Sequence, residues 1–261
     1  MTVFLLELRR GWKPFVVWCL AVAGMVGISM SLFPSMEESL EEVTSLFANM
    51  GSFTAAFGMD QLALGSLTGY YGVENGTILG LGGGMYAAYT AIAVLSKEEG
   101  ERTAEFLLAH PVRRISVALQ KLAAVLVFVL ALNLVVLAAG AGSIALIGEE
   151  VPWHDLLLLH GGYVLMQVEV AIACFGVSAF LRRGSVGLGL GLVLMLYFAN
   201  IMNNIGDGDS GLAYITPFAY AEPSTVLDAG SIDPVLAGVG YAAALVIATA
   251  GTAYYLRKDV F

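Results

Sequence analysis

Residues 118–147 read "ALQKLAAVLVFVLALNLVVLAAGAGSIALI" and carry a single charged side chain, Lys121. A membrane hydrocarbon core about 30 Å thick is crossed by about 20 mostly apolar helical residues, so this stretch is long enough to span a bilayer. Five other stretches meet the same requirement: residues 14–33, 75–95, 156–181, 185–205 and 235–256. The sequence therefore predicts an all-α integral membrane protein with six transmembrane helices.

The composition of the whole chain supports this class. Of its 261 residues 58% are hydrophobic and 13% are charged, and the mean hydropathy of +0.81 lies outside the range of soluble globular domains. The net charge of −9 argues against nucleic acid as a partner and leaves membrane lipid as the expected surroundings. Cys19 and Cys174 stand far apart in apolar runs, so neither a disulfide framework nor a metal site is predicted.

The distribution of charge predicts how the spans are oriented. Lys and Arg collect in cytoplasmic loops, and six spans place all 12 cations of the chain on one side: Arg9, Arg10, Lys13, Lys97, Arg102, Arg113, Arg114, Lys121, Arg182, Arg183, Arg257 and Lys258. The opposite side then holds only acids: Glu37, Glu38, Glu41, Glu42, Asp60, Glu74, Glu149, Glu150, Asp155, Asp207, Asp209, Glu222, Asp228 and Asp233. Residues 1–261 are therefore expected to form one transmembrane domain with both termini in the cytoplasm.

Three segments outside the spans have patterns of their own. Residues 2–15 indicate an amphipathic helix on the inner surface that leads into the first span. In the outer segment 34–72, Ser35 and Glu38 form a capping-box pattern, which predicts that an amphipathic helix starts there and lies at the membrane interface. The outer segment 206–234 is apolar but interrupted by prolines, which favours a short re-entrant or interfacial piece over another span.

The segment between the second and third predicted spans, residues 96–117, concentrates charge. Ser96 can cap a short helix that has Glu99 at its third position, and the helix should end near His110 because Pro111 disfavours helical geometry there. Apolar residues on a charged, exposed helix favour a docking face, although a solvated connector is the alternative. One face of the helix collects the less polar side chains: Thr103, Phe106, Leu107 and His110.

This segment resembles a known family. Residues 98–114 have the pattern E-E-x-x-R-T-A-E-F-L-L-A-x-P-V-x-R, and Lys121 opens the next span, as in the cytoplasmic loop of type-2 ABC exporter permeases. "ELRRGWKPF", "YITPFAYAEP" and the terminal "RKDVF" extend the resemblance over the chain. It implies a permease that pairs with a second permease copy, as a homodimer or heterodimer, and with two ABC ATPase subunits. It also implies that the loop is a coupling helix, with these contact residues: Glu98, Glu99, Arg102, Thr103, Glu105, Phe106, Leu107, His110, Arg113 and Arg114.

The chemistry that is missing from the sequence agrees with a transport subunit. There is no G-x-x-x-x-G-K-[ST] motif and no recognisable catalytic set, so ATP and Mg are expected on the partner ATPase, with no cofactor on this chain. The resemblance implies export across a prokaryotic cytoplasmic membrane. Because the outer segments are small, a hydrophobic drug or antimicrobial peptide is the expected cargo.

Polar side chains inside the predicted spans are candidates for a substrate path. A charge near the bilayer centre costs about 2.5 to 3.5 kcal/mol, so Glu169 should face the protein interior or a wet cavity. Each candidate has a structural alternative, which is a hydrogen bond that holds helices together. If Glu169 instead served as a proton or ion site, the chain would be a secondary transporter or channel that needs no ATPase. The candidates for the path are Glu169, Gln167, His160, Asn133 and Asn200.

Two pairs of glycines have the spacing that lets membrane helices approach each other closely. Gly80 and Gly84 form one pair, and Gly187 and Gly191 form the other. Neither glycine-rich stretch contains the lysine of a phosphate-binding loop. Both pairs are therefore predicted to serve helix packing.

Overall fold

The structure is a computed structural model that describes residues 3–47, 52–56, 62, 65–97, 113–181, 185–206 and 211–258. The predicted all-α class is confirmed, since these residues form helices and include no strand. By length and composition, five helices of this part of the chain can cross a membrane: α1 (Val3–Phe47), α7 (Arg114–Leu146), α8 (Trp153–Ser178), α9 (Val186–Ile205) and α11 (Pro234–Arg257).

The sequence signals at helix ends explain several of these boundaries. The Asp233 carboxylate accepts hydrogen bonds from the backbone N–H groups of Val235 (2.7 Å) and Leu236 (3.2 Å), which caps α11 directly before Pro234 at its first position. After α7, Gly148 adopts a φ of +88°, which side chains with a Cβ rarely tolerate. The predicted spans 118–147, 156–181, 185–205 and 235–256 each differ from the observed helices by only a few residues at either end.

The predicted span 75–95 is built differently from the others. Helix α3 (Leu67–Tyr70) continues through a π-helical turn (Tyr71–Asn75) into α4 (Gly76–Ala91), and the residues at both junctions keep right-handed helical geometry. The combined path is about 37 Å long at about 1.5 Å per residue. Helix α4 alone has only 16 residues, which is too short to cross a bilayer by itself. The π-helical turn is a local feature that apolar periodicity does not reveal.

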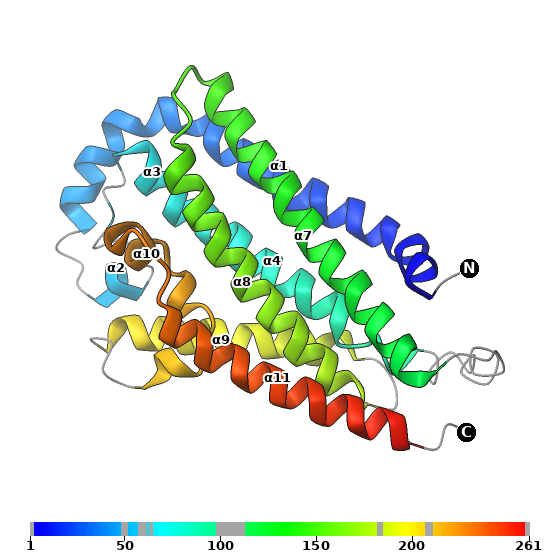
Figure 1. The fold of residues 1–261 in the computed structure, drawn as a ribbon. Coiled ribbons are helices and arrows are strands. Elements are labelled where there is room, and N and C mark those ends of the chain that lie inside the picture. The colour runs from blue at the N-terminus through cyan, green and yellow to red at the C-terminus, as the bar shows by residue number, and fades with distance from the viewer. Residues whose placement is uncertain are drawn as a thin grey trace.

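Helix α1 corrects the prediction for the N-terminal region. A surface helix, a span and a new helix capped at Ser35 were expected, but α1 is one helix of 45 residues that passes through Pro14 and Pro34. The capping box is wrong because the Ser35 hydroxyl donates to the carbonyl oxygen of Leu32 (2.8 Å) inside the continuing helix. A proline inside a helix removes one backbone hydrogen bond and can kink the helix without ending it. Figure 1 shows α1 changing direction toward its C-terminal end.

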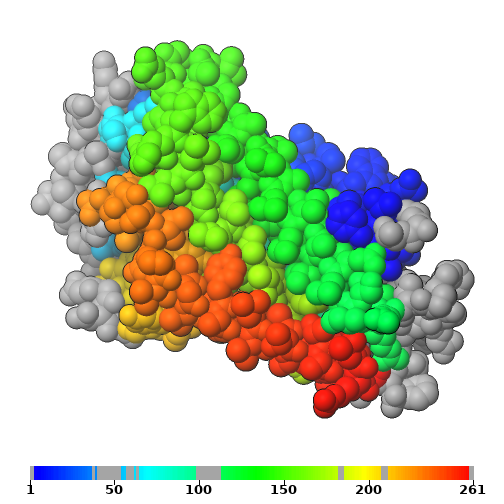
Figure 2. Space-filling model, in the orientation of Figure 1, coloured from blue at the N-terminus to red at the C-terminus, as the bar shows by residue number. Residues whose placement is uncertain are grey.

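The helices form a bundle with α4 and α8 in its centre. Helices α1 and α7 pack together on one side, α9 packs on α4, and α11 packs on α8 (Figure 1). Figure 2 shows α7, α8 and α11 side by side on one face of the molecule. Each of these three helices carries exposed apolar side chains, such as Leu134, Leu157 and Val246. An apolar outer surface of this extent is expected of a protein that faces lipid.

Glycines decide where the helices approach most closely. A methyl group on Gly251 of α11 would overlap the Gly176 backbone of α8, so these two helices are in direct backbone contact. Gly84 lies against Val193 of α9, as predicted for its pair. No atom in the described part of this chain lies within 4 Å of a Cβ built on Gly187 or Gly191, so packing by the second pair stays a prediction. Those two glycines point away from the neighbouring helices.

Both termini lie at one end of the bundle, here called the terminal end (Figure 1). The segment 206–234 lies at the opposite end, and its described part forms three short helices; its role as a re-entrant or interfacial piece stays a prediction. The three helices are the 3₁₀ turns Leu212–Tyr214 and Ala219–Ala221 and the helix α10 (Pro223–Ala229). The short helix α2 (Ser52–Ala56) lies at the same opposite end.

Candidate functional site

An ion cluster links three elements at the terminal end. The Lys121 side chain is fully buried, its Nζ donates to the carbonyl oxygen of Val94 (2.6 Å), and it lies 3.5 Å from Oε1 of Glu7. The Nζ of Lys97 lies 3.7 Å from Oε2 of the same Glu7 carboxylate. Glu7 belongs to α1, Lys121 to α7, and Lys97 follows α4. One carboxylate of α1 therefore lies beside a cation at the start of the segment 96–117 and another just after its end.

A cavity of about 270 Å³ adjoins the cluster. Its polar wall contains Glu7, Arg10, Lys97 and Lys121, and the rest is mainly apolar and includes Phe128. Lys97 is the first residue of the predicted coupling helix, so this cavity lies beside the start of that segment.

The C-terminal part of the segment 96–117 makes a separate contact. Arg114, the first residue of α7, donates through Nη1 to the carbonyl oxygen of Lys258 (2.6 Å), which caps the end of α11. Arg113 is the N-cap residue of α7 and has extended backbone geometry. The remaining predicted coupling residues lie outside the described residues: Glu98, Glu99, Arg102, Thr103, Glu105, Phe106, Leu107 and His110.

Two of the predicted path residues form one polar contact in the centre of the bundle. Nδ2 of Asn133 donates to Oε1 of Gln167 (2.7 Å), and Nε2 of Gln167 donates to the carbonyl oxygen of Leu79 (3.1 Å). These bonds connect α7, α8 and α4. A methyl group on Gly83 of α4 would overlap the Gln167 amide, so the glycine leaves the space that this amide occupies.

The other predicted path residues make separate contacts. The Tyr220 hydroxyl donates to Oε2 of Glu169 (2.8 Å), and the same carboxylate lies against Gly240 of α11. His160 shares a hydrogen bond of 2.8 Å with the Tyr71 hydroxyl in the π-helical turn. The structure thus brings Asn133 and Gln167 together but does not join Glu169 or His160 to them. Their assignment to a substrate path stays a prediction.

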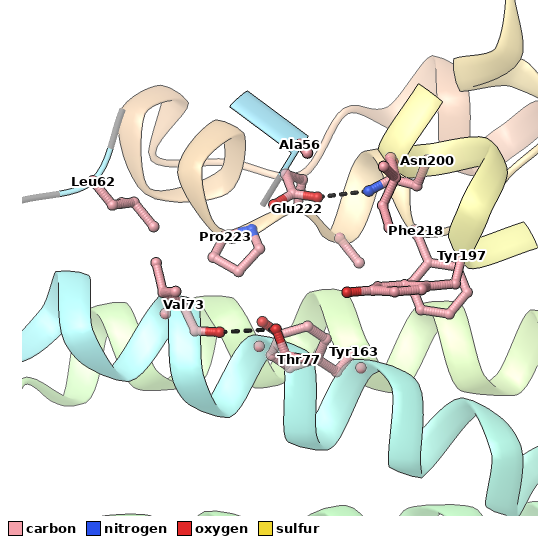
Figure 3. A pocket seen from close by; sticks show the side chains of 15 residues that line it. Ala56, Leu62, Val73, Thr77, Tyr163, Tyr197, Asn200, Phe218, Glu222 and Pro223 are labelled. Carbon is pink, nitrogen blue, oxygen red and sulfur yellow. Dashed lines mark hydrogen bonds between the residues drawn. The ribbon is translucent and has the colours of Figure 1, made fainter. Parts of the chain in front are cut away.

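Asn200 belongs to a pocket at the opposite end of the bundle, here called the outer pocket (Figure 3). Its Nδ2 donates to Oε2 of Glu222 (2.7 Å), and Nδ2 of Asn204 lies 3.3 Å from the same oxygen. Figure 3 shows the Tyr197 hydroxyl pointing from α9 into the pocket. The cavity has a volume of about 40 Å³ and joins α4, α8, α9 and the segment that carries Glu222.

Two polar atoms in the walls of the outer pocket lack partners. The hydroxyl of Tyr163 and Oδ1 of Asn200 are buried, and neither has a hydrogen-bond partner among the residues that the structure describes. Tyr163 and Asn200 are each only 3% exposed. Gly76 makes room for the Tyr163 hydroxyl, because a Cβ there would lie 2.7 Å from its oxygen.

Sequence reasoning overlooked several of these residues or gave them a smaller role. Glu7 was part of an expected surface helix, although its position as an acid beside the cations of the cytoplasmic side could have marked it as a partner for Lys121. Glu222 counted only as an outer acid. Tyr71, Tyr163 and Tyr220 had no signal at all, because a tyrosine in an apolar helix is common and only the fold shows what its hydroxyl contacts.

These features define a helical membrane protein with a polar interior, an ion cluster at one end and a small polar pocket at the other. The chain belongs to the ABC-2 family of transporters, since the family model described as "ABC-2 family transporter protein" matches residues 1–260. The resemblance seen in the sequence is thus confirmed. No curated protein and no solved structure matches the chain. Membership makes the chain a membrane permease of an ABC transporter and implies an ABC ATPase subunit as its partner.

Proposed function

We propose that the protein is the permease of an ATP-driven exporter and that residues 96–117 couple it to a separate ATPase. Family membership supports the transport role. The observation that carries the coupling role is the shared Glu7 carboxylate, which faces Lys97 at the start of the segment and Lys121 just after it. A displacement of the segment by the ATPase would act on α1 and α7 together through these ion pairs.

The proposal includes a topology. The path from Leu67 to Ala91 serves as the sixth span, in addition to the five helices that are long and apolar enough to cross a membrane. The terminal end faces the cytoplasm, since Lys and Arg collect there. The membrane is the cytoplasmic membrane of a prokaryote.

The assembly contains two permease chains, identical or related, and two ATPase subunits that bind ATP and Mg. The cargo is a hydrophobic drug or antimicrobial peptide, which agrees with the small size of the outer segments. Apolar contacts of Phe106 and Leu107 dock the segment on the ATPase, and Glu98, Glu99, Arg102 and Glu105 make polar contacts around them.

Replacement of Phe106 tests the coupling. We expect the unmodified chain, purified from its native membrane, to carry ATP-hydrolysing activity that depends on a P-loop ATPase. Phe106→Asp should lose this activity at normal expression, because a charge replaces an apolar anchor, whereas Phe106→Leu should retain it. If Phe106→Asp retains as much ATPase as Phe106→Leu, the coupling assignment is wrong.

A further inference from the structure

The outer pocket is lined by oxygen atoms rather than by positive charge. Its polar walls come from the Glu222 carboxylate, the Asn200 carbonyl oxygen and the hydroxyls of Thr77, Tyr163 and Tyr197 (Figure 3). Among the described residues that line it there is no Lys, Arg or His. The described lining therefore contributes one carboxylate and no cationic side chain.

Two polar atoms of the lining residues lack a hydrogen-bond partner in the described part of the chain. The amide nitrogen of Asn200 donates to Glu222, and no described residue donates a hydrogen bond to its oxygen. Asn200 Oδ1 and the Tyr163 hydroxyl are buried without a hydrogen-bond partner among the described residues. Such groups are normally satisfied in proteins. An occupant that supplies positive charge or hydrogen-bond donors fits both atoms and the carboxylate.

The size of the pocket restricts the occupant. A water-sized group needs about 10–15 Å³ measured in this way, so a cavity of about 40 Å³ admits an ion or a small head group but not a drug. Carboxylate, carbonyl and hydroxyl oxygens suit hard cations. The walls contain one carboxylate, and no group of three or more His, Cys, Asp or Glu side chains that could hold a metal ion occurs in the described part of the chain. A single charge favours a monovalent cation over a divalent one.

We propose that the outer pocket binds a small monovalent cation, either an alkali ion or a primary ammonium group, between Glu222, Asn200 and Tyr163. The bound cation connects α8 and α9 to the segment that precedes α10. Binding stabilises the folded chain and does not require the ATPase. The outcome of its test is therefore separate from that of the coupling role.

Thermal unfolding of the purified full-length chain in detergent measures this binding. The chain is titrated with sodium, potassium or methylammonium chloride, and N-methylglucamine chloride keeps the ionic strength constant. We expect at least one of the small cations to raise the Tm saturably, by about 2–5 °C at tenfold excess over its Kd. A response to the alkali ions identifies an ion site, and a response to methylammonium identifies an ammonium site. If no small cation raises the Tm above the level in N-methylglucamine, the pocket holds only water and the proposal is wrong.

Matched variants locate the effect. Glu222→Gln should abolish the rise in Tm, whereas Asp228→Asn, which removes an exposed carboxylate from α10, should leave it unchanged. Tyr163→Phe removes a hydroxyl without a described partner, so it should keep the fold and raise the half-saturating concentration at least tenfold. If Glu222→Gln does not fold, the titration of Tyr163→Phe alone tests whether the cation binds in the outer pocket. An unchanged half-saturating concentration in Tyr163→Phe overturns the proposal.

Discussion

Glu7→Gln should destabilise the protein because it removes an anion that lies 3.5 Å from the buried ammonium of Lys121. Removal of one partner of a buried ion pair lowers the free energy of unfolding by about 3–5 kcal/mol. The lower end, about 3 kcal/mol, applies here because the Glu7 side chain keeps 10% exposure and the pair is 3.5 Å apart. Lys121 itself has no exposed surface, so water cannot replace the lost charge.

A double-mutant cycle with Lys121→Met separates this effect from general damage to α1. Once the buried ammonium is absent, Glu7→Gln should lower the free energy of unfolding by less than about 1 kcal/mol, because the charge that the carboxylate faces is gone. Reversible denaturant unfolding in detergent, followed by circular dichroism, measures all four variants. Glu150→Gln, which changes an exposed acid after α7, is the control and should stay within about 0.5 kcal/mol of the unmodified protein.

The reasoning fails if Glu7→Gln behaves like Glu150→Gln, or if it costs the same with Met at position 121 as with Lys. Either result would mean that the ion pair contributes nothing to folding. Because the same carboxylate faces Lys97, the cycle also tests whether the base of the coupling segment is tied energetically to α1.

Two further predictions concern the interior of the bundle. Gly251→Ala should lower the free energy of unfolding by about 1–3 kcal/mol in the same assay, because its methyl group would overlap the Gly176 backbone. Gly238→Ala on the same helix is the control and should be tolerated, since nothing lies within 4 Å of a Cβ there in the described structure. Glu169→Gln should keep the fold and ATP-driven export, because the amide oxygen can still accept the Tyr220 hydrogen bond. If the variant loses transport, or if its transport no longer depends on pH, a gradient-driven transporter is favoured instead.

The predicted spans agree well with the structure where the apolar runs are long and end at strong signals. Asp233 and Pro234 mark the start of α11 in the sequence as clearly as they do in the structure. The prediction at Ser35 is wrong because a Ser that follows a Pro satisfies the pattern of a helix start as well as that of a helix interior. Only the neighbouring turns decide which of the two forms.

The candidate sites could be predicted in part. Glu169, Gln167 and Asn133 stood out in the sequence as polar residues within apolar stretches. The sequence did not show which residues they contact. A partner such as Tyr220 lies on a segment far away in the chain, and its hydroxyl meets Glu169 only because the short helices at the opposite end pack against α8.

The sequence by itself determined the class of the protein, its helical content and the segregation of its charges. These properties depend on local composition and on the free energy of transferring side chains from water to lipid, which is nearly additive along a chain. The tertiary structure alone decided that Lys121 is buried against Glu7, that Gly251 meets Gly176, and that oxygens from four elements surround one pocket. Hydrogen bonds and ion pairs require atoms within about 3–4 Å of each other. Distances of that size between remote residues arise only when the helices pack.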